Sequence, residues 1–239
     1  HGRDENHKTI FYTALYHSLL NPNLYTDVDG RYRGMDMQIH QDSADNHYTI
    51  FSLWDTFRAT HPLFTLIEQE KTNEFIRTFL RQYRQGGKLP IWELAANYTN
   101  CMIGYHAIPV IADAYVKGIR DYNIEEAMDA MIYSANLDTE GLEYYKAKGF
   151  IAASDEPESV SKTLEYAYDD WCIAMMADSL GREDVANYFY QRGQYYKNVY
   201  DPSTKFFRAK VNNNWFGPFV PDEVNFNYTE ANAWQYSTF

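Results

Sequence analysis

Apolar residues recur along this 239-residue chain three and four positions apart, the spacing of a helix face, while the strict alternation typical of strands is scarce. In the clearest case, 72–85, the large apolar side chains share one face and two glycines follow as a C-terminal stop. The pattern predicts an all-α protein of about eight helices. The other predicted helices are 9–20, 46–59, 62–68, 101–119, 124–136, 157–180 and 182–200, and a last one begins at Thr229.

Two kinds of predicted helix alternate along the chain. The segments 101–119 and 159–180 are the more apolar, which predicts an interior position, whereas 72–85 and 183–200 are amphipathic. Pro109, inside the first of these, predicts a kink. Such alternation suits the paired inner and outer helices of an α/α toroid or an α-solenoid. Because the sequence shows no repeat of fixed period, the toroid is favoured.

Two long segments carry no helical pattern. Residues 22–45 are polar and rich in Asp, and we expect a surface loop there, of the kind that often carries function. Residues 201–228 are irregular and rich in Asn, Phe and Pro, with a possible short hairpin in 206–219. No shift in composition marks a boundary between domains, so a single domain is expected.

Composition narrows the classes of partner. A net charge of −12 argues against a nucleic-acid partner, because binding phosphates requires a basic face. No apolar run approaches the roughly 18 residues that a membrane-spanning helix needs. Aromatic residues make up 17% of the chain. Aromatic faces pack against the C–H faces of sugars, although an aromatic-rich core would give the same composition.

Hydrolysis of a glycosidic bond usually needs two carboxyl groups. The sequence offers several acidic residues beside or close to aromatic ones. They are Asp55 in "SLWDTF", Glu93 in "PIWELA", Asp169 and Asp170 in "YAYDDW", and Glu230 in "NYTEAN".

Each of these acids also has a structural explanation. Asp169 and Asp170 fall within a predicted helix, where either could be solvated or paired. Glu93 could lie in a first helical turn and interact favourably with the positive end of the helix dipole. Asp55 lies in an apolar stretch, so its burial would require a partner or a ligand. Glu230 falls in a predicted first helical turn, which lowers a carboxyl pKa unless burial among neighbouring aromatics offsets the effect.

Other kinds of site find little support. The seven histidines show no His-x-x-x-His spacing and no Cys-x-x-Cys pair occurs, which argues against a zinc site. The stretch "DVDG" at 27–30 begins like a calcium loop but lacks the remaining EF-hand ligands. Neither a Gly-rich phosphate loop nor a G-x-S-x-G elbow is present.

Long motifs in unbroken order resemble the calcium-dependent exo-α-mannosidases of glycoside hydrolase family 92. The likeness spans nearly the whole chain. The motifs are "FYTALYHSLLNP", "DGRYRGMD", "YTIFSLWDTFRATHPL", "LPIWELAANYTNCMIGYHAIPVIADAY", "ESVSKTLEYAYDDWCIA" and "NYTEANAWQYS".

The resemblance implies a fold and a reaction. It implies an (α/α)6 toroid that follows an N-terminal β-sandwich domain, and removal of terminal α-linked mannose with inversion, as in N-glycan degradation. A Ca2+ ion would engage the sugar hydroxyls. By motif, Glu230 matches the general acid, and Trp54 with Asp55 matches the pair that grips the terminal mannose. Glu93 and Asp169 fall in family motifs and are predicted to bind substrate.

The chain departs from the family pattern in one motif, the one that would supply the general base. The resemblance implies a general-base aspartate in a Gly-Asn-Asp-Asp-type motif downstream of the acid, and the chain contains no such motif. We therefore expect residues 1–239 to be part of one toroid catalytic domain, a partial (α/α)6 toroid, with the calcium ligands mostly outside it. The 239 residues alone are predicted to be inactive. The family implies secretion, to the periplasm or the cell exterior.

Two alternatives stay open at this point. The chain could belong to another α/α-toroid carbohydrate enzyme, such as an inverting glucosidase or a lyase. It could also be a non-catalytic helical domain that binds sugar or acts as a scaffold.

Overall fold

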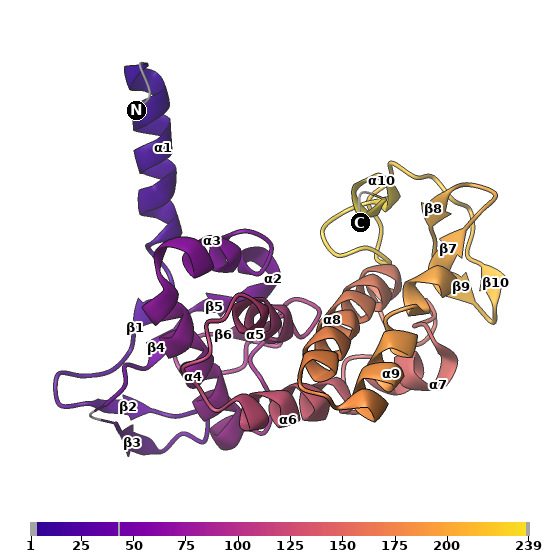
Figure 1. The fold of residues 1–239 in the computed structure, drawn as a ribbon. Coiled ribbons are helices and arrows are strands. Elements are labelled where there is room, and N and C mark those ends of the chain that lie inside the picture. The colour runs from indigo at the N-terminus through magenta and orange to yellow at the C-terminus, as the bar shows by residue number, and fades with distance from the viewer. Residues whose placement is uncertain (1–3, 43, 238–239) are drawn as a thin grey trace.

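The computed structural model describes residues 4–42 and 44–237 and is mainly helical (Figure 1). The predicted all-α class is confirmed. The α-helices are α1 (Glu5–Ser18), α2 (Leu53–Thr56), α3 (Thr60–Ile67), α4 (Gln69–Gly86), α5 (Ala107–Val116), α6 (Ile124–Ala135), α7 (Leu142–Lys148), α8 (Ser159–Ser179), α9 (Glu183–Arg192) and α10 (Ala233–Tyr236), with a 3-10 helix η1 (Tyr195–Val199).

The strands are short and pair two by two in antiparallel fashion. The pairs are β1 (Asn23–Leu24) with β4 (Tyr48–Thr49), β2 (Arg31–Arg33) with β3 (Ile39–Gln41), β5 (Phe51–Ser52) with β6 (Trp92–Glu93), β7 (Tyr200–Asp201) with β8 (Phe206–Phe207), and β9 (Lys210–Val211) with β10 (Asn214–Trp215). These pairs shape connections between helices and build no extended sheet.

The core lies around α5 and α8, which pack against each other. Most residues of both helices are buried, as expected of helices with little polar surface. Helix α9 lies alongside α8, and α4 packs against α3, α5 and α6. Helix α1 extends away from the rest of the molecule and has no buried residue among those described (Figure 1).

The strongest helical patterns predict the structure well. Helix α4 ends at Gly86, and the next residue, Gly87, caps it with a φ of +81° in the left-handed region that glycine tolerates. Predicted helices 124–136 and 157–180 correspond to α6 and α8. The hairpin expected in 206–219 is confirmed by the pairing of β9 with β10.

Other boundaries were predicted wrongly. In 46–59 the first half forms β4 and β5, joined by Ile50 with a φ of +67°, and only 53–56 forms helix α2. Helix α5 begins at Ala107 rather than 101, so Pro109 lies in its first turn, where the missing N–H would have had no intrahelical partner. Helix α7 had not been predicted.

Candidate active site

Trp54 and Asp55 lie on the short helix α2, whose start is fixed by the strand before it. Strand β5 pairs with β6 through Ser52 opposite Trp92, so α2 emerges directly from a two-strand ladder. Trp54 is half-buried and Asp55 is exposed, accepting a short hydrogen bond from the Ser52 hydroxyl. The apolar stretch around Asp55 raised the question of a buried carboxylate, but the single turn of α2 leaves this side chain open to solvent.

The Trp54 side chain meets a carboxylate that the sequence analysis had not singled out. Its indole Nε1–H donates to Oε1 of Glu165 at 3.3 Å, and Nη2 of Arg58 donates to the same oxygen at 2.7 Å. Glu165 is fully buried on α8, whereas the Arg58 side chain is 40% exposed. The Arg58 guanidinium also lies over the ring of Phe57, 4.6 Å from its centroid, and over that of Trp54 at 5.7 Å.

His106 lies between two buried carboxylates. Its Nε2 is 3.0 Å from Oε2 of Glu165, and its Nδ1 is 2.8 Å from Oδ1 of Asp169. Asp169 also accepts the backbone N–H of Tyr105 at 2.9 Å. Phe57 stacks on the imidazole with ring centroids 4.0 Å apart. All three charged side chains are fully buried. We call Arg58, Glu165, His106 and Asp169 the buried charge chain.

Within the buried charge chain, positive and negative side chains alternate, and the pKa of each buried member is affected by its neighbours. Burial is the largest influence on His106 and would lower its pKa, but Asp169 and Glu165 outweigh it and raise that pKa to about 9. Burial likewise acts to raise the pKa of Glu165, but His106 and Arg58 together hold it below its usual value. Burial raises the pKa of Asp169, against the opposing effect of His106. The two carboxylates therefore favour the imidazolium form of His106.

Asp170, the neighbour of Asp169, belongs to a different network. It accepts hydrogen bonds from the Tyr105 hydroxyl at 2.7 Å, the Tyr145 hydroxyl at 3.0 Å and Nε of Arg192 at 2.9 Å. Burial raises its pKa to about 6, although Arg192 opposes the shift. Both mid-helix aspartates are thus paired rather than solvated, and Asp170 ties α8 to α7 and α9.

Glu93 lies in strand β6, not in a helical first turn as one interpretation of the sequence proposed. It is fully buried and accepts hydrogen bonds from the Thr49 hydroxyl at 2.9 Å and the Ala96 N–H at 2.6 Å. Burial raises its pKa. Ala96 has a φ of +62°, so the carboxylate secures a strained loop just beyond the strand that supports α2.

Glu230 is exposed and lies in a turn with a φ of +50°. The helix expected to begin at Thr229 begins at Ala233, because Asn232 forms a reciprocal capping box with Gln235. Glu230 is therefore neither in the first helical turn nor buried among aromatic side chains.

The end of this segment does return to the buried charge chain. The Thr229 N–H donates to the Ser161 hydroxyl at 2.9 Å, which ties the turn to the first part of α8. Tyr236 on α10 is buried, and burial, with the nearby Glu165 carboxylate adding to it, raises its pKa to about 12. The stretch 227–236 thus brings Tyr236 close to Glu165.

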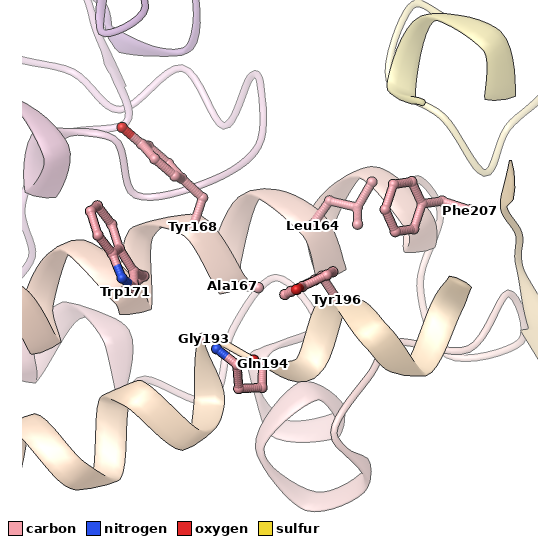
Figure 2. A pocket seen from close by; sticks show the side chains of 8 residues that line it. All are labelled: Leu164, Ala167, Tyr168, Trp171, Gly193, Gln194, Tyr196 and Phe207. Carbon is pink, nitrogen blue, oxygen red and sulfur yellow. The ribbon is translucent and has the colours of Figure 1, made fainter. Parts of the chain in front are cut away.

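A cavity of about 400 Å³ lies between α8, the residues that follow α9, η1 and β8, and Figure 2 shows the side chains that line it. Tyr168 and Trp171 stack on one part of its wall with ring centroids 6.4 Å apart, and Tyr168 also contacts Phe57 of the α2 region at 5.7 Å. None of the site residues predicted from the sequence lines this cavity. The lining residues are Leu164, Ala167, Tyr168, Trp171, Gly193, Gln194, Tyr196 and Phe207.

Sequence reasoning missed Arg58, Glu165 and His106. One signal was available, because Glu165 and Asp169 are four positions apart and so share a face of a helix. Nothing local in the sequence pointed to His106, which lies 59 and 63 positions before its two carboxylates.

Residues 4–42 and 44–237 hold no helix that is long and apolar enough to span a membrane. They also hold no group of three or more His, Cys, Asp or Glu side chains placed to bind a metal ion.

The chain belongs to glycoside hydrolase family 92, because residues 1–239 match the model of the glycosyl hydrolase family 92 catalytic domain. Two solved relatives come from Bacteroides thetaiotaomicron. The family GH92 α-mannosidase BT3965 is 42% identical, with a TM-score of 0.91 over 95% of this chain and 31% of its own. The family GH92 inverting mannosidase BT2199 is 36% identical, with a TM-score of 0.86 over 94% of this chain and 32% of its own.

A curated relative, an uncharacterized secreted glycosidase of Arthroderma benhamiae, is 25% identical over 94% of this chain and 27% of its own length. The chain therefore spans less than a third of the length of each of these relatives.

Proposed function

We propose that the chain is part of the catalytic domain of an α-mannosidase that removes terminal α-linked mannose from glycans with inversion. The observation that carries the proposal is the 42% identity and the TM-score of 0.91 shared with an enzyme named as an α-mannosidase, over 95% of the chain. The second solved relative, which is named as an inverting mannosidase, supports the stereochemistry.

Glu230 is the proposed general acid. It is exposed in a turn anchored to α8, so its carboxyl is accessible to the leaving oxygen of a bound glycoside. A base outside residues 1–239 would activate the attacking water, with the two carboxyls about 6.5–9.5 Å apart as inversion requires. The 239 residues alone would then be inactive.

Trp54 and Asp55 are the proposed contacts to the terminal mannose. Asp55 presents an exposed carboxylate that can accept hydrogen bonds from sugar hydroxyls, and the half-buried Trp54 presents indole surface beside it. Glu93 and Asp169 were expected to bind substrate as well. Their full burial supports a different proposal, in which each holds the backbone or a neighbouring side chain in place.

A Ca2+ ion is proposed to assist the reaction in the complete enzyme. Calcium takes six to eight oxygen ligands, and the described residues bring no three acidic side chains together to supply them. The side chains of this part of the chain thus do not fit a calcium site, and the ligands are proposed to come mostly from elsewhere in the enzyme.

The remaining proposals concern context. The rest of the catalytic domain and an N-terminal β-sandwich domain are the proposed partners, and mannose-containing glycans such as N-glycans the substrates. Export to the periplasm or the cell exterior is proposed, with the secreted name of the fungal relative as support.

The test uses the full-length protein with p-nitrophenyl glycosides of α-mannose and α-glucose. We expect release from the α-mannoside, with β-mannose as the first anomer in the NMR spectrum, and loss of activity on dialysis against a chelator that calcium restores. Glu230→Gln should abolish hydrolysis of a glycan substrate while binding persists. Hydrolysis of the glucoside alone would favour another toroid enzyme, and binding without any hydrolysis would favour a sugar-binding domain.

A further inference from the structure

We propose that Glu165 and His106 are positioning residues, which hold the Trp54 indole and the Arg58 guanidinium in a single orientation at the mannose-binding end of α2. The inference rests on the proposed function, because it takes Trp54 to be a contact to the sugar. It assigns a role to two fully buried side chains that do not themselves reach the ligand.

The first step in the argument is the sharing of one carboxylate oxygen. Oε1 of Glu165 accepts from both Trp54 Nε1–H and Arg58 Nη2, so the orientations of the indole and the guanidinium depend on each other. Helix α2 provides little support of its own, since it has four residues and the Ser52 side chain at its N-cap accepts no hydrogen bond from a backbone N–H of the helix. An indole on such a helix needs an outside anchor to stay in one rotamer.

The second step is that the anchor is itself held. The second oxygen of Glu165 faces His106, and the other imidazole nitrogen bonds to Asp169. The flat face of His106 packs on Phe57, which comes from the same segment as Trp54. The contacts therefore close a ring from Trp54 through Glu165, His106 and Phe57 back to the Trp54 segment.

The third step concerns the cost of burying charge. Replacing a buried ion pair by apolar side chains of similar volume is often neutral or stabilising, so packing alone gives no reason for charges here. The need to hold polar groups at the surface in a fixed orientation does give a reason for these charges. A binding site works only when its contacting side chains are held closely in place. The partly exposed members, Trp54 and Arg58, lie at the end that a ligand can reach.

The experiment compares Glu165→Gln and His106→Gln in the full-length protein with the matched control Asp170→Asn. Asp170 is also a fully buried carboxylate on α8 with a buried cationic partner, but its hydrogen bonds go to Tyr105, Tyr145 and Arg192 and not to Trp54 or Arg58. Steady-state kinetics on the α-mannoside separate KM from kcat, and thermal melts report stability.

We expect Glu165→Gln and His106→Gln to raise KM roughly ten- to a hundred-fold, the range seen when groups that orient a ligating side chain are lost. The change in kcat should be much smaller, because contacts to the terminal sugar made in the bound substrate persist in the transition state. The double variant should raise KM no more than the more damaging single variant does, since both substitutions break the same ring of contacts. Asp170→Asn should lower the melting temperature and leave KM unchanged.

Three outcomes count against the inference. If Glu165→Gln shifts only the melting temperature, as the control does, Glu165 is structural and the proposed function is untouched. If the unsubstituted full-length protein hydrolyses no α-mannoside, the proposed function fails and the inference with it. Should Glu165→Gln yield no folded protein, Trp54→Phe removes the indole donor together with part of the ring surface, and an unchanged KM in that variant would count against the role of the Glu165 contact.

Discussion

His106 and Glu165 form an ion pair of 3.0 Å in which neither side chain is exposed to solvent. They come from the N-cap of α5 and from the middle of α8, the two helices at the centre of the core. Charged groups facing the imidazole are Glu165 and Asp169 from α8, and Arg58 lies beyond Glu165. The pair therefore couples the stability of the core to the protonation of a single histidine.

Stability should fall as pH rises through 9. The pKa of His106 is raised from its ordinary 6.5 to about 9, so its protonated form is favoured by folding. That contribution, of the order of a few kcal/mol, is fully present below pH 6.5 and is lost as pH rises through 9. Urea unfolding of the protein and of His106→Gln between pH 6 and pH 10 measures it. The two pH profiles should diverge below pH 9, and parallel profiles would show that His106 is not charged.

Arg192→Met should destabilise the fold by about 3–5 kcal/mol, because it leaves the buried Asp170 carboxylate without its cation. Denaturant unfolding at pH 7.5 measures the loss. Adding Asp170→Asn to Arg192→Met should recover part of the lost free energy, since a neutral amide costs less to bury than a carboxylate. A double variant no more stable than the single one would contradict this account of the pair.

Gly104 and Gly118 allow strain and steric overlap to be separated. Both have positive φ, +77° and +83°, but a Cβ on Gly118 meets open space whereas one on Gly104 would lie 2.5 Å from Cε1 of His106. Gly118→Ala should cost about 1–2 kcal/mol from backbone strain. Gly104→Ala should cost about 1–3 kcal/mol more, because His106 is locked by two carboxylates and cannot yield. Equal losses in unfolding free energy would mean that the imidazole moves freely.

Thr49→Val should cost about 1–3 kcal/mol despite its matched shape. The Thr49 hydroxyl donates to Glu93 at 2.9 Å and accepts from the Ala95 N–H at 2.7 Å, so valine leaves a buried carboxylate and a part-buried N–H each short of a partner. Thr139→Val, at an exposed position, is the control and should change stability by less than about 0.5 kcal/mol. Chemical denaturation of both variants provides the comparison, and similar losses would contradict the role of Glu93 in holding its loop.

Helices with a clear local signal, such as an amphipathic face or a capping residue, were predicted from the sequence. Helix α4 has an amphipathic face and a glycine stop, and α6 has the Asn123 cap, so both were placed within a few residues. Helix α2 was not, because 48–52 carries a helix-like apolar run that instead pairs with strands from 23–24 and 92–93. Local propensity cannot report a partner that lies 24 to 42 positions away.

The residues of the candidate site likewise fall into two groups, those that a local motif identified and those that only the fold brings together. Trp54, Asp55 and Glu230 were identified by motif, and the structure places them on exposed or half-exposed turns without testing their roles. Arg58, Glu165 and His106 act through contacts across the fold. Their importance depends on burial and on pairing, and neither is visible in a sequence pattern that offers several dozen charged residues of similar kind.

The bond from Trp54 to Glu165 joins positions 111 residues apart. Ordering such a contact means closing a long loop first, which slows folding and places the contact late on the folding route. The half-buried indole therefore cannot take its final orientation until α8, which carries Glu165, is in place. During synthesis from the N-terminus, α2 leaves the ribosome long before its anchor exists, so the segment around Trp54 is among the last parts to become ordered.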